Sequence, residues 1–145
     1  MRKTLLMLVL LLGLVATVTA CGGSDNDSSP SAEAGASEEE LSAEEASAEI
    51  DEIKSLLEQA VMQYRAGDKT AADTTVGDAY LEHFEKVEHP LEERDHDFME
   101  DLEHRISTEI RDEMKKDAPA DEVAALVDET KADLNNAKAK LQESK

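Results

Sequence analysis

Histidines and carboxylates gather in one short part of this chain. All the histidines lie within 22 residues, at positions His83, His89, His96 and His104. The same stretch is crowded with acidic residues: Glu82, Glu85, Glu88, Glu92, Glu93, Asp95, Asp97, Glu100, Asp101 and Glu103. Imidazole nitrogen and carboxylate oxygen together suit iron, zinc, copper or manganese. The stretch is therefore the first candidate for a metal site.

Spacing selects a first group of candidate ligands from this set. Glu85, Glu88 and His89 are three and four residues apart, so they share a face of any helix that extends that far. They would also lie at the C-terminus of that helix. There the negative end of the macrodipole disfavours each carboxylate by about 0.3–1 kcal/mol, unless a cation or a basic partner compensates.

A second group follows on the next predicted helix. Glu93 and His96 could approach from its start, and Glu103 lies at the edge of its apolar stripe, where it alone among these acids could tilt inward. Helical angles instead place Glu85 opposite the apolar stripe of its own helix. No pair of inward Glu-x-x-His motifs is present for a buried dinuclear centre. Two interpretations therefore remain open: a solvated acidic hairpin with incidental histidines, or a cation site at the rim of the hairpin.

His83 differs from the other histidines because it falls on an apolar stripe. An inward histidine is more often a hydrogen-bonded core residue than a ligand, and Tyr64 or Tyr80 would be its partner. Both tyrosines are expected in the core with their hydroxyls at its boundary. Catalytic motifs such as Gly-x-Ser-x-Gly, His-Glu-x-x-His or a phosphate-binding glycine loop do not occur, so we do not expect an enzyme.

Apolar residues recur every three or four positions from about residue 46 onward, which predicts helices. β-Branched residues never alternate, so no strand is expected. The predicted stripes are these: Ile50, Ile53, Leu57, Ala60, Val61 and Tyr64; then Ala72, Val76, Ala79, Tyr80, His83, Phe84 and Val87; then Phe98, Leu102, Ile106, Ile110 and Met114; then Val123, Leu126, Val127, Thr130, Leu134, Ala137 and Leu141. Residues 46–145 are predicted to form an all-α, antiparallel up-and-down four-helix bundle.

Glycine, aspartate and proline mark the expected helix ends. Gly67 would stop the first helix and Asp68 would cap the second. Pro90 would end the second helix, because proline disfavours helical geometry in the residue before it. Asp95 or Asp97 would cap the third helix.

The N-terminus predicts the location of the protein. Arg2 and Lys3 precede an apolar run at 5–18, which is shorter than the roughly 20 residues of a membrane span and is typical of a secretory signal. Val18-Thr19-Ala20-Cys21 resembles the lipobox of bacterial lipoproteins. This implies a signal peptide at 1–20, lipidation of Cys21, and attachment to the cell membrane outside the cytoplasm. Residues 21–45 lack aromatic residues and predict a disordered acidic linker.

The net charge of the chain restricts the kinds of molecule that it can bind. The chain carries 15 basic and 35 acidic residues, a net charge of −20. Cleavage would remove Arg2 and Lys3, which leaves 13 basic residues and a net charge of −22. Such a surface repels nucleic acid and attracts cations and basic partners.

The stretch from Tyr64 to Leu141 resembles the extracytoplasmic helical domain attached to bacterial high-affinity iron permeases. The resemblance depends on these segments: Tyr64-Arg65-Ala66-Gly67-Asp68, Asp78-Ala79-Tyr80-Leu81-Glu82-His83-Phe84-Glu85, Glu88 with Leu91, Leu102 with Glu103, and 123–141. It implies Glu85, Glu88 and Glu103 as acidic site residues, with Tyr80 and Phe84 as packing residues.

This resemblance implies a domain that collects or presents iron beside a permease. The chain lacks the family's transmembrane helices and its Arg-Glu-Gly-Leu-Glu segments, which excludes transport by the chain alone. We therefore expect the accessory domain by itself on a lipid anchor, with an iron permease or another basic-surfaced membrane protein as its partner. The alternative is an acidic protein-interaction lipoprotein with no specific metal site.

Overall fold

The structure, a computed structural model, describes residues 41–143. The predicted signal peptide, Cys21 and most of the predicted linker lie outside the described residues. None of the helices between residues 41 and 143 has the length and apolar content needed to cross a lipid bilayer.

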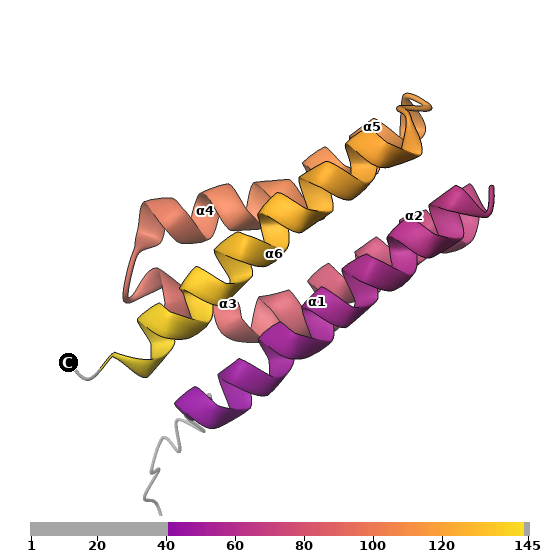
Figure 1. The fold of residues 1–145 in the computed structure, drawn as a ribbon. Coiled ribbons are helices and arrows are strands. Elements are labelled where there is room, and N and C mark those ends of the chain that lie inside the picture. The colour runs from indigo at the N-terminus through magenta and orange to yellow at the C-terminus, as the bar shows by residue number, and fades with distance from the viewer. Residues whose placement is uncertain (1–40, 144–145) are drawn as a thin grey trace, which may run out of the picture. The chain divides into compact units, whose positions relative to one another are not determined.

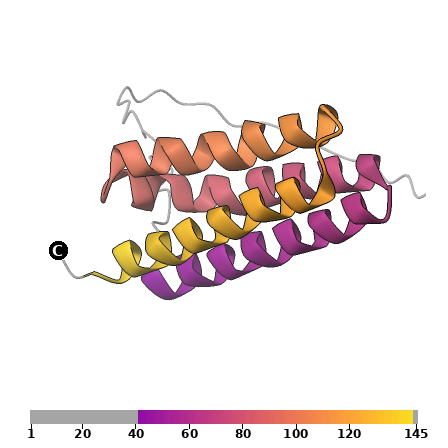
Figure 2. The ribbon, with the colours of Figure 1, turned by 45° about the horizontal axis from the view of Figure 1, so that its top comes forward.

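Helical segments join end to end into four helical runs (Figure 1). The first run is α1 (Ala43–Arg65). The second consists of α2 (Lys69–Asp78), η1 (Ala79–Phe84) and α3 (Glu85–Glu92). The third consists of α4 (His96–His104), η2 (Arg105–Glu109) and α5 (Ile110–Lys115), and the fourth is α6 (Ala120–Gln142). Segments η1 and η2 are π-helical. The predicted all-α four-helix bundle is confirmed (Figure 2).

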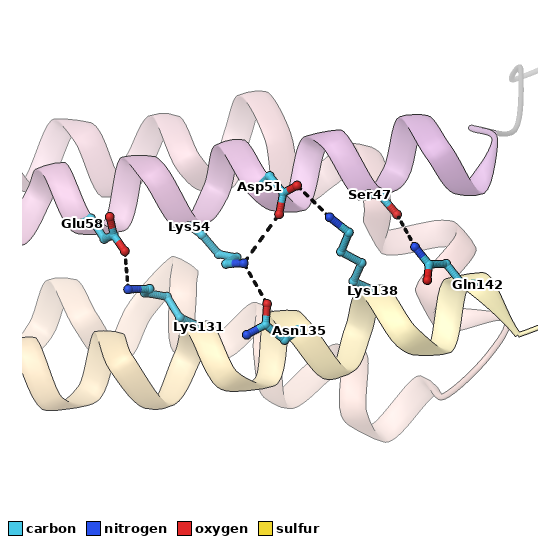
Figure 3. A network of polar contacts seen from close by, with 8 residues as sticks. All are labelled: Ser47, Asp51, Lys54, Glu58, Lys131, Asn135, Lys138 and Gln142. Carbon is cyan, nitrogen blue, oxygen red and sulfur yellow. Dashed lines mark hydrogen bonds and ion pairs between the residues drawn. The ribbon is translucent and has the colours of Figure 1, made fainter.

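Side-chain pairs establish that neighbouring runs are antiparallel. On the seam between the first and fourth runs, Asp51 pairs with Lys138, and Glu58, further along α1, pairs with the earlier residue Lys131 (Figure 3). The residue number therefore rises on one helix as it falls on the other. The bundle is up-and-down, as predicted, and its first and last helices lie side by side.

The same reversal relates the second run to the third. Asp73 accepts two hydrogen bonds from Arg111, whereas Tyr80, later in the second run, contacts the earlier residue Glu103. These two runs form the hairpin that carries the candidate ligands. The contacts of Tyr80 and Asp73 fix its register.

The predicted stripes meet in a single apolar core. The largest fully buried side chains come from all four runs: Phe84, Ile50, Ile53, Leu57, Leu91, Leu102, Ile106, Ile110, Leu134, Val76, Val87 and Val123. Burial of side chains of this size stabilises a fold by about 1.5–3 kcal/mol each relative to leaving them exposed. Leu81 and Met62 are the large apolar side chains that stay exposed within residues 41–143.

The bundle begins earlier than the apolar pattern indicates. Helix α1 starts at Ala43, inside the predicted linker, because Ser42 and Glu45 form a reciprocal capping box. Leu41 packs against the core just before this cap. This partial burial of Leu41 helps to fix where the chain enters the first helix.

Gly67 and two aspartates end and begin helices as predicted. Gly67 has a φ of +85°, and the bonds from Gly67 N to Tyr64 O and from Asp68 N to Gln63 O form a Schellman motif after α1. Asp68 caps α2 through the backbone N–H of Ala71. Between the two candidates for the third run, Asp95 is the cap, since it accepts from the N–H of Phe98.

The prediction that Pro90 ends the second helix is wrong. Pro90 lies inside α3, which continues to Glu92. Its missing N–H removes a single backbone bond close to the helix end, and Leu91 is fully buried in the core. Packing of Leu91, together with the bonds that its carbonyl accepts from the N–H groups of Arg94 and Asp95, holds the last turn in place.

Candidate functional site

Three oxygen-bearing side chains meet between the second and third runs. The hydroxyl of Tyr80 lies 3.1 Å from Glu103 Oε1 and 3.4 Å from Glu88 Oε1. All three side chains are half-buried. One phenolic hydrogen cannot serve two carboxylates fully, and the shorter distance assigns it to Glu103. Glu88 and Glu103 are thus held near each other with a single proton donor between them.

The electrostatics of this cluster are unfavourable for its own charges. Burial raises the pKa of Glu88 above its usual value, and the charges of Glu103 and Glu85 raise it further. Burial, the hydrogen bond to Glu103 and the nearby charge of Glu88 raise the pKa of Tyr80 to about 12. Each of these shifts records a negative charge that is costly to form at this place.

No basic side chain of the described residues pairs with the carboxylates of this cluster. Among residues 41–143, no lysine, arginine or histidine forms an ion pair with Glu85, Glu88 or Glu103. We call Tyr80, Glu85, Glu88 and Glu103 the oxygen cluster.

On the seam between α1 and α6, by contrast, carboxylates are paired with lysines (Figure 3). There Lys138 pairs with Asp51 at 2.7 Å and Lys131 pairs with Glu58. The lysines lower the pKa of both carboxyls below their ordinary values. The two sites therefore differ: the seam carboxylates have lysine partners, whereas Glu88 and Glu103 are half-buried without a basic partner within residues 41–143.

Both π-helical turns lie next to the oxygen cluster. Tyr80 belongs to η1, and Glu103 comes two residues before η2 begins. The two turns contact each other. π-Turns inside α-helices are often found at functional sites. Tyr80 is further held by stacking on the buried ring of Phe84, with centroids 6.1 Å apart, which is the packing role expected of this pair.

His89 and His96 lie at the exposed tip of the hairpin rather than in the oxygen cluster. Glu92 lies between them, with oxygens 4.0 Å from His89 Nδ1 and 3.5 Å from His96 Nδ1. His96, Asp97 and Glu100 bring one ligand atom each within 4.8 Å of one another, and all three are exposed. Bulk water screens such a group, and the i,i+4 spacing of His96 and Glu100 on one helix, with Asp97 next to His96 in sequence, accounts for its geometry.

Glu93 is exposed and lines a small hollow at the end of the bundle, beside Pro90 and Arg94.

The structure therefore separates the six predicted ligands into two groups. Glu88 and Glu103 come together, with Glu85 close enough to raise the pKa of Glu88. His89, Glu93 and His96 occupy the hairpin tip and bundle end. Glu85 itself is exposed, as its helical angle predicts.

The predicted hydrogen-bond partner of His83 is wrong. His83 Nδ1 lies 2.6 Å from Glu49 Oε2 on the first run, and Lys86 donates to the other oxygen of Glu49 at 2.9 Å. Tyr64 instead donates to the carbonyl of Ala118 at 2.8 Å. His83 therefore links two helices at the edge of the core.

Sequence reasoning missed the hydroxyl of Tyr80 as a site group. The apolar stripe correctly placed its ring against the core, but the same tyrosine turns its oxygen toward two carboxylates. The sequence did contain a signal for this contact. Tyr80 and Glu88 lie on the second predicted helix, and Glu103 lies on the third, which the predicted hairpin packs against the second. No family model, curated protein or solved structure matches this chain, so functional assignment depends on these residues.

Proposed function

We propose that this protein is a lipid-anchored extracytoplasmic domain that binds a cation, most specifically iron, and presents it to a membrane transporter. The observation that carries the proposal is the uncompensated charge of the oxygen cluster. Glu88 and Glu103 lie around one phenol and have no basic partner within residues 41–143, whereas other acids such as Asp73, Glu58 and Asp51 are paired. A bound cation would supply the missing positive charge.

The chemistry of the donors favours a hard cation. Carboxylate and phenol groups offer only oxygen, which suits magnesium, calcium, manganese and oxidised iron better than soft metals. Donors come from two antiparallel runs whose register is fixed by buried side chains, so the site has a defined geometry before a cation arrives. Glu88 and Glu103 are only half-buried, so solvent cations can reach their oxygens.

The location and the partner derive from the sequence. Cys21 within its lipobox-like segment supports attachment to the cell membrane outside the cytoplasm, and the acidic surface supports a basic-surfaced partner such as an iron permease. A domain that binds the cation close to the transporter would raise the local concentration of that cation at the transporter entrance. The domain itself would perform no transport and no catalysis.

The test is a cation titration of the purified chain with thermal unfolding as the readout. Ferrous, ferric, manganese, zinc and calcium ions would be added separately, with ferric iron supplied as its nitrilotriacetate complex. A ligand that binds only the folded state stabilises it by about 2.7 kcal/mol at 100 times its Kd. The double variant Glu88→Gln/Glu103→Gln should lose the specific part of this stabilisation.

A matched control separates a site from general screening. Glu52 and Glu129 are exposed, and the double variant Glu52→Gln/Glu129→Gln makes the same change of charge away from the cluster. This control should respond to cations as the wild type does. Equal stabilisation by all divalent cations, unchanged in both double variants, would reject the cation site and leave the acidic protein-interaction function.

A further inference from the structure

A hollow on the seam between α1 and α6 has an exposed methionine in its lining. The hollow has a volume of about 290 Å³, and its apolar lining consists of Val61, Met62, Ala124 and Val127. Met62 is 63% exposed, whereas Val61 and Val127 are buried. A flexible thioether side chain is suited to filling irregular gaps at a binding surface. An exposed apolar side chain beside an apolar hollow can pair with a second copy of the same surface.

The charges around this hollow are balanced, unlike those of the chain as a whole. Two acidic and two basic residues line it: Glu58, Asp128, Arg65 and Lys131. The whole chain carries 35 acidic and 15 basic residues, so two copies repel each other at long range. Contact between two copies is therefore least opposed at a surface where both signs of charge occur equally, as they do here.

The charges at the two ends of the hollow differ in sign on each helix. On α1, Glu58 lies seven residues before Arg65, which is roughly 10 Å along an α-helix, and Met62 lies between them. On α6, Lys131 pairs with Glu58 (Figure 3), and Asp121 pairs with Arg65 at 2.9 Å. Each helix therefore carries an acid at one end of the hollow and a base at the other.

We propose that this hollow is the contact between two copies of the chain, related by a two-fold axis that crosses the helices beside Met62. The axis places α1 of one copy antiparallel to α1 of the other, so Glu58 of each copy faces Arg65 of the other copy. In the same arrangement Lys131 of each copy faces Asp121 of the other copy. Met62 of each copy enters the hollow of the other. Such a contact uses one surface patch twice and closes after two copies.

The side chains of this contact can take the additional partners. Glu58 and Arg65 are each more than half exposed although they already pair within one copy. The contact extends over about two turns of α1, so it is smaller than the roughly 800 Å² per partner of a standard stable interface. We therefore expect monomers and dimers in exchange rather than an obligate dimer. Chemical cross-linking traps such a dimer as it forms.

Cross-linking through position 62 tests the contact in cells that express the full chain. The two copies of Met62 meet at the axis, so Met62→Cys treated with a short bismaleimide should give a band at twice the monomer mass. Leu81→Cys is the matched control, because Leu81 is also exposed but does not line this hollow. The wild type, whose only cysteine is Cys21, gives the background. The yield from Met62→Cys should exceed both by about fivefold or more, since a formed contact raises the effective concentration of the two thiols.

Exchange of charges tests the two-fold geometry. In the Met62→Cys background, Glu58→Arg would place like charges opposite each other twice in the dimer, and so would Arg65→Glu. Each change alone should lower the cross-linked yield on the order of 10-fold. Co-expression of the two variants should restore most of the yield, because both facing pairs in the mixed dimer again have opposite charges. Damage to the fold would not be repaired by mixing two variants.

Each outcome supports or overturns the dimer. A yield from Met62→Cys no higher than that from Leu81→Cys would overturn it. A cross-linked band of another mass would assign the hollow to a different protein and also overturn it. Charge variants that do not recover when they are co-expressed would exclude the two-fold axis. None of these substitutions changes the oxygen cluster, so the dimer is tested independently of the proposed function.

Discussion

Tyr80 and Glu88 are eight residues apart on the same helical run, yet their side-chain oxygens lie 3.4 Å from each other. In a regular α-helix the neighbours of a residue are three and four positions away. The π-helical turn Ala79–Phe84 contains Tyr80, ends before Glu88 and alters the register of the run. An irregular backbone thus brings together the phenol and the carboxylate that define the candidate site.

Glu88→Gln should make the cation-free protein more stable at neutral pH. The folded-state pKa of Glu88 is raised, so its contribution to stability is fully present below the unfolded value of 4.5 and is lost as pH rises through the folded value. Removing the charge should gain about 0.5 kcal/mol at pH 7, the scale of a like-charge contact on a helix. Urea unfolding at pH 7 and pH 4 measures this, and the gain should disappear at pH 4.

Asp73→Asn should have the opposite pH dependence, which makes it a control for Glu88→Gln. Hydrogen bonding to Arg111 holds the pKa of Asp73 below its usual value, so its stabilisation is present above the ordinary value of 3.8 and is lost as pH falls through the folded value. The variant should be less stable at pH 7 by up to about 1 kcal/mol. Equal effects at pH 7 and at low pH would contradict the assigned pairing.

At two helix ends where the backbone has a positive φ, glycine should give a more stable protein than alanine. Asp117 has a φ of 60°, and the bonds after α5 repeat the Schellman pattern that follows α1. Asp117→Gly should be about 1 kcal/mol more stable than Asp117→Ala, because both lose the Lys69 pair and only alanine retains backbone strain. At Gly67 alanine should cost a similar amount, although a Cβ there meets no neighbour. Thermal unfolding of the variants would decide the order.

Two prolines should give effects of opposite sign. Pro90→Ala restores the N–H that a helix donates to the carbonyl of Lys86, so it should stabilise by about 1–2 kcal/mol after allowance for the freer unfolded chain. Pro119 precedes α6 with a φ of −51°, which suits proline. Pro119→Ala should therefore be neutral or cost up to about 1 kcal/mol. Destabilisation by Pro90→Ala would show that the proline is needed for the hairpin turn.

Truncation of Leu102 should test the core beside the oxygen cluster. Leu102 is 2% exposed, and Leu102→Ala should cost about 2–5 kcal/mol through lost burial and a cavity. Leu81 is 59% exposed in the neighbouring run, and Leu81→Ala should stay within about 0.5 kcal/mol. Chemical denaturation measures both. Similar losses at the two leucines would contradict the packing described for η1 and α4.

Local periodicity predicted the elements of this fold because helix burial repeats along the chain itself. Ile50, Ile53 and Leu57 are fully buried where their spacing places them, and Gly67 ends the first helix as its conformational freedom predicts. Pro90 was misjudged because its effect depends on Leu91, whose burial is a tertiary property. The local preference against helix before a proline does not take account of tertiary packing, which can outweigh it.

The candidate ligands could be predicted only in part, because sequence spacing shows which residues share a face of one helix and not which residues meet between two helices. Glu88 and Glu103 were both candidates, but their meeting around Tyr80 requires the register between two runs. His83 was assigned to a tyrosine for the same reason, whereas its partner Glu49 lies on the first run. The π-turns shift this register without a change in apolar spacing large enough to reveal them.

The seam that joins α1 to α6 has a consequence for how the polypeptide acquires its shape. Helices from opposite ends of the described sequence depend on each other for burial, and pairs such as Asp51 with Lys138 are 87 positions apart. Contacts of such long range must wait until α6 has been synthesised, which slows folding compared with purely local structure. A nascent chain can therefore pack α1 against the second run first, but the side of α1 that faces α6 stays uncovered until α6 emerges.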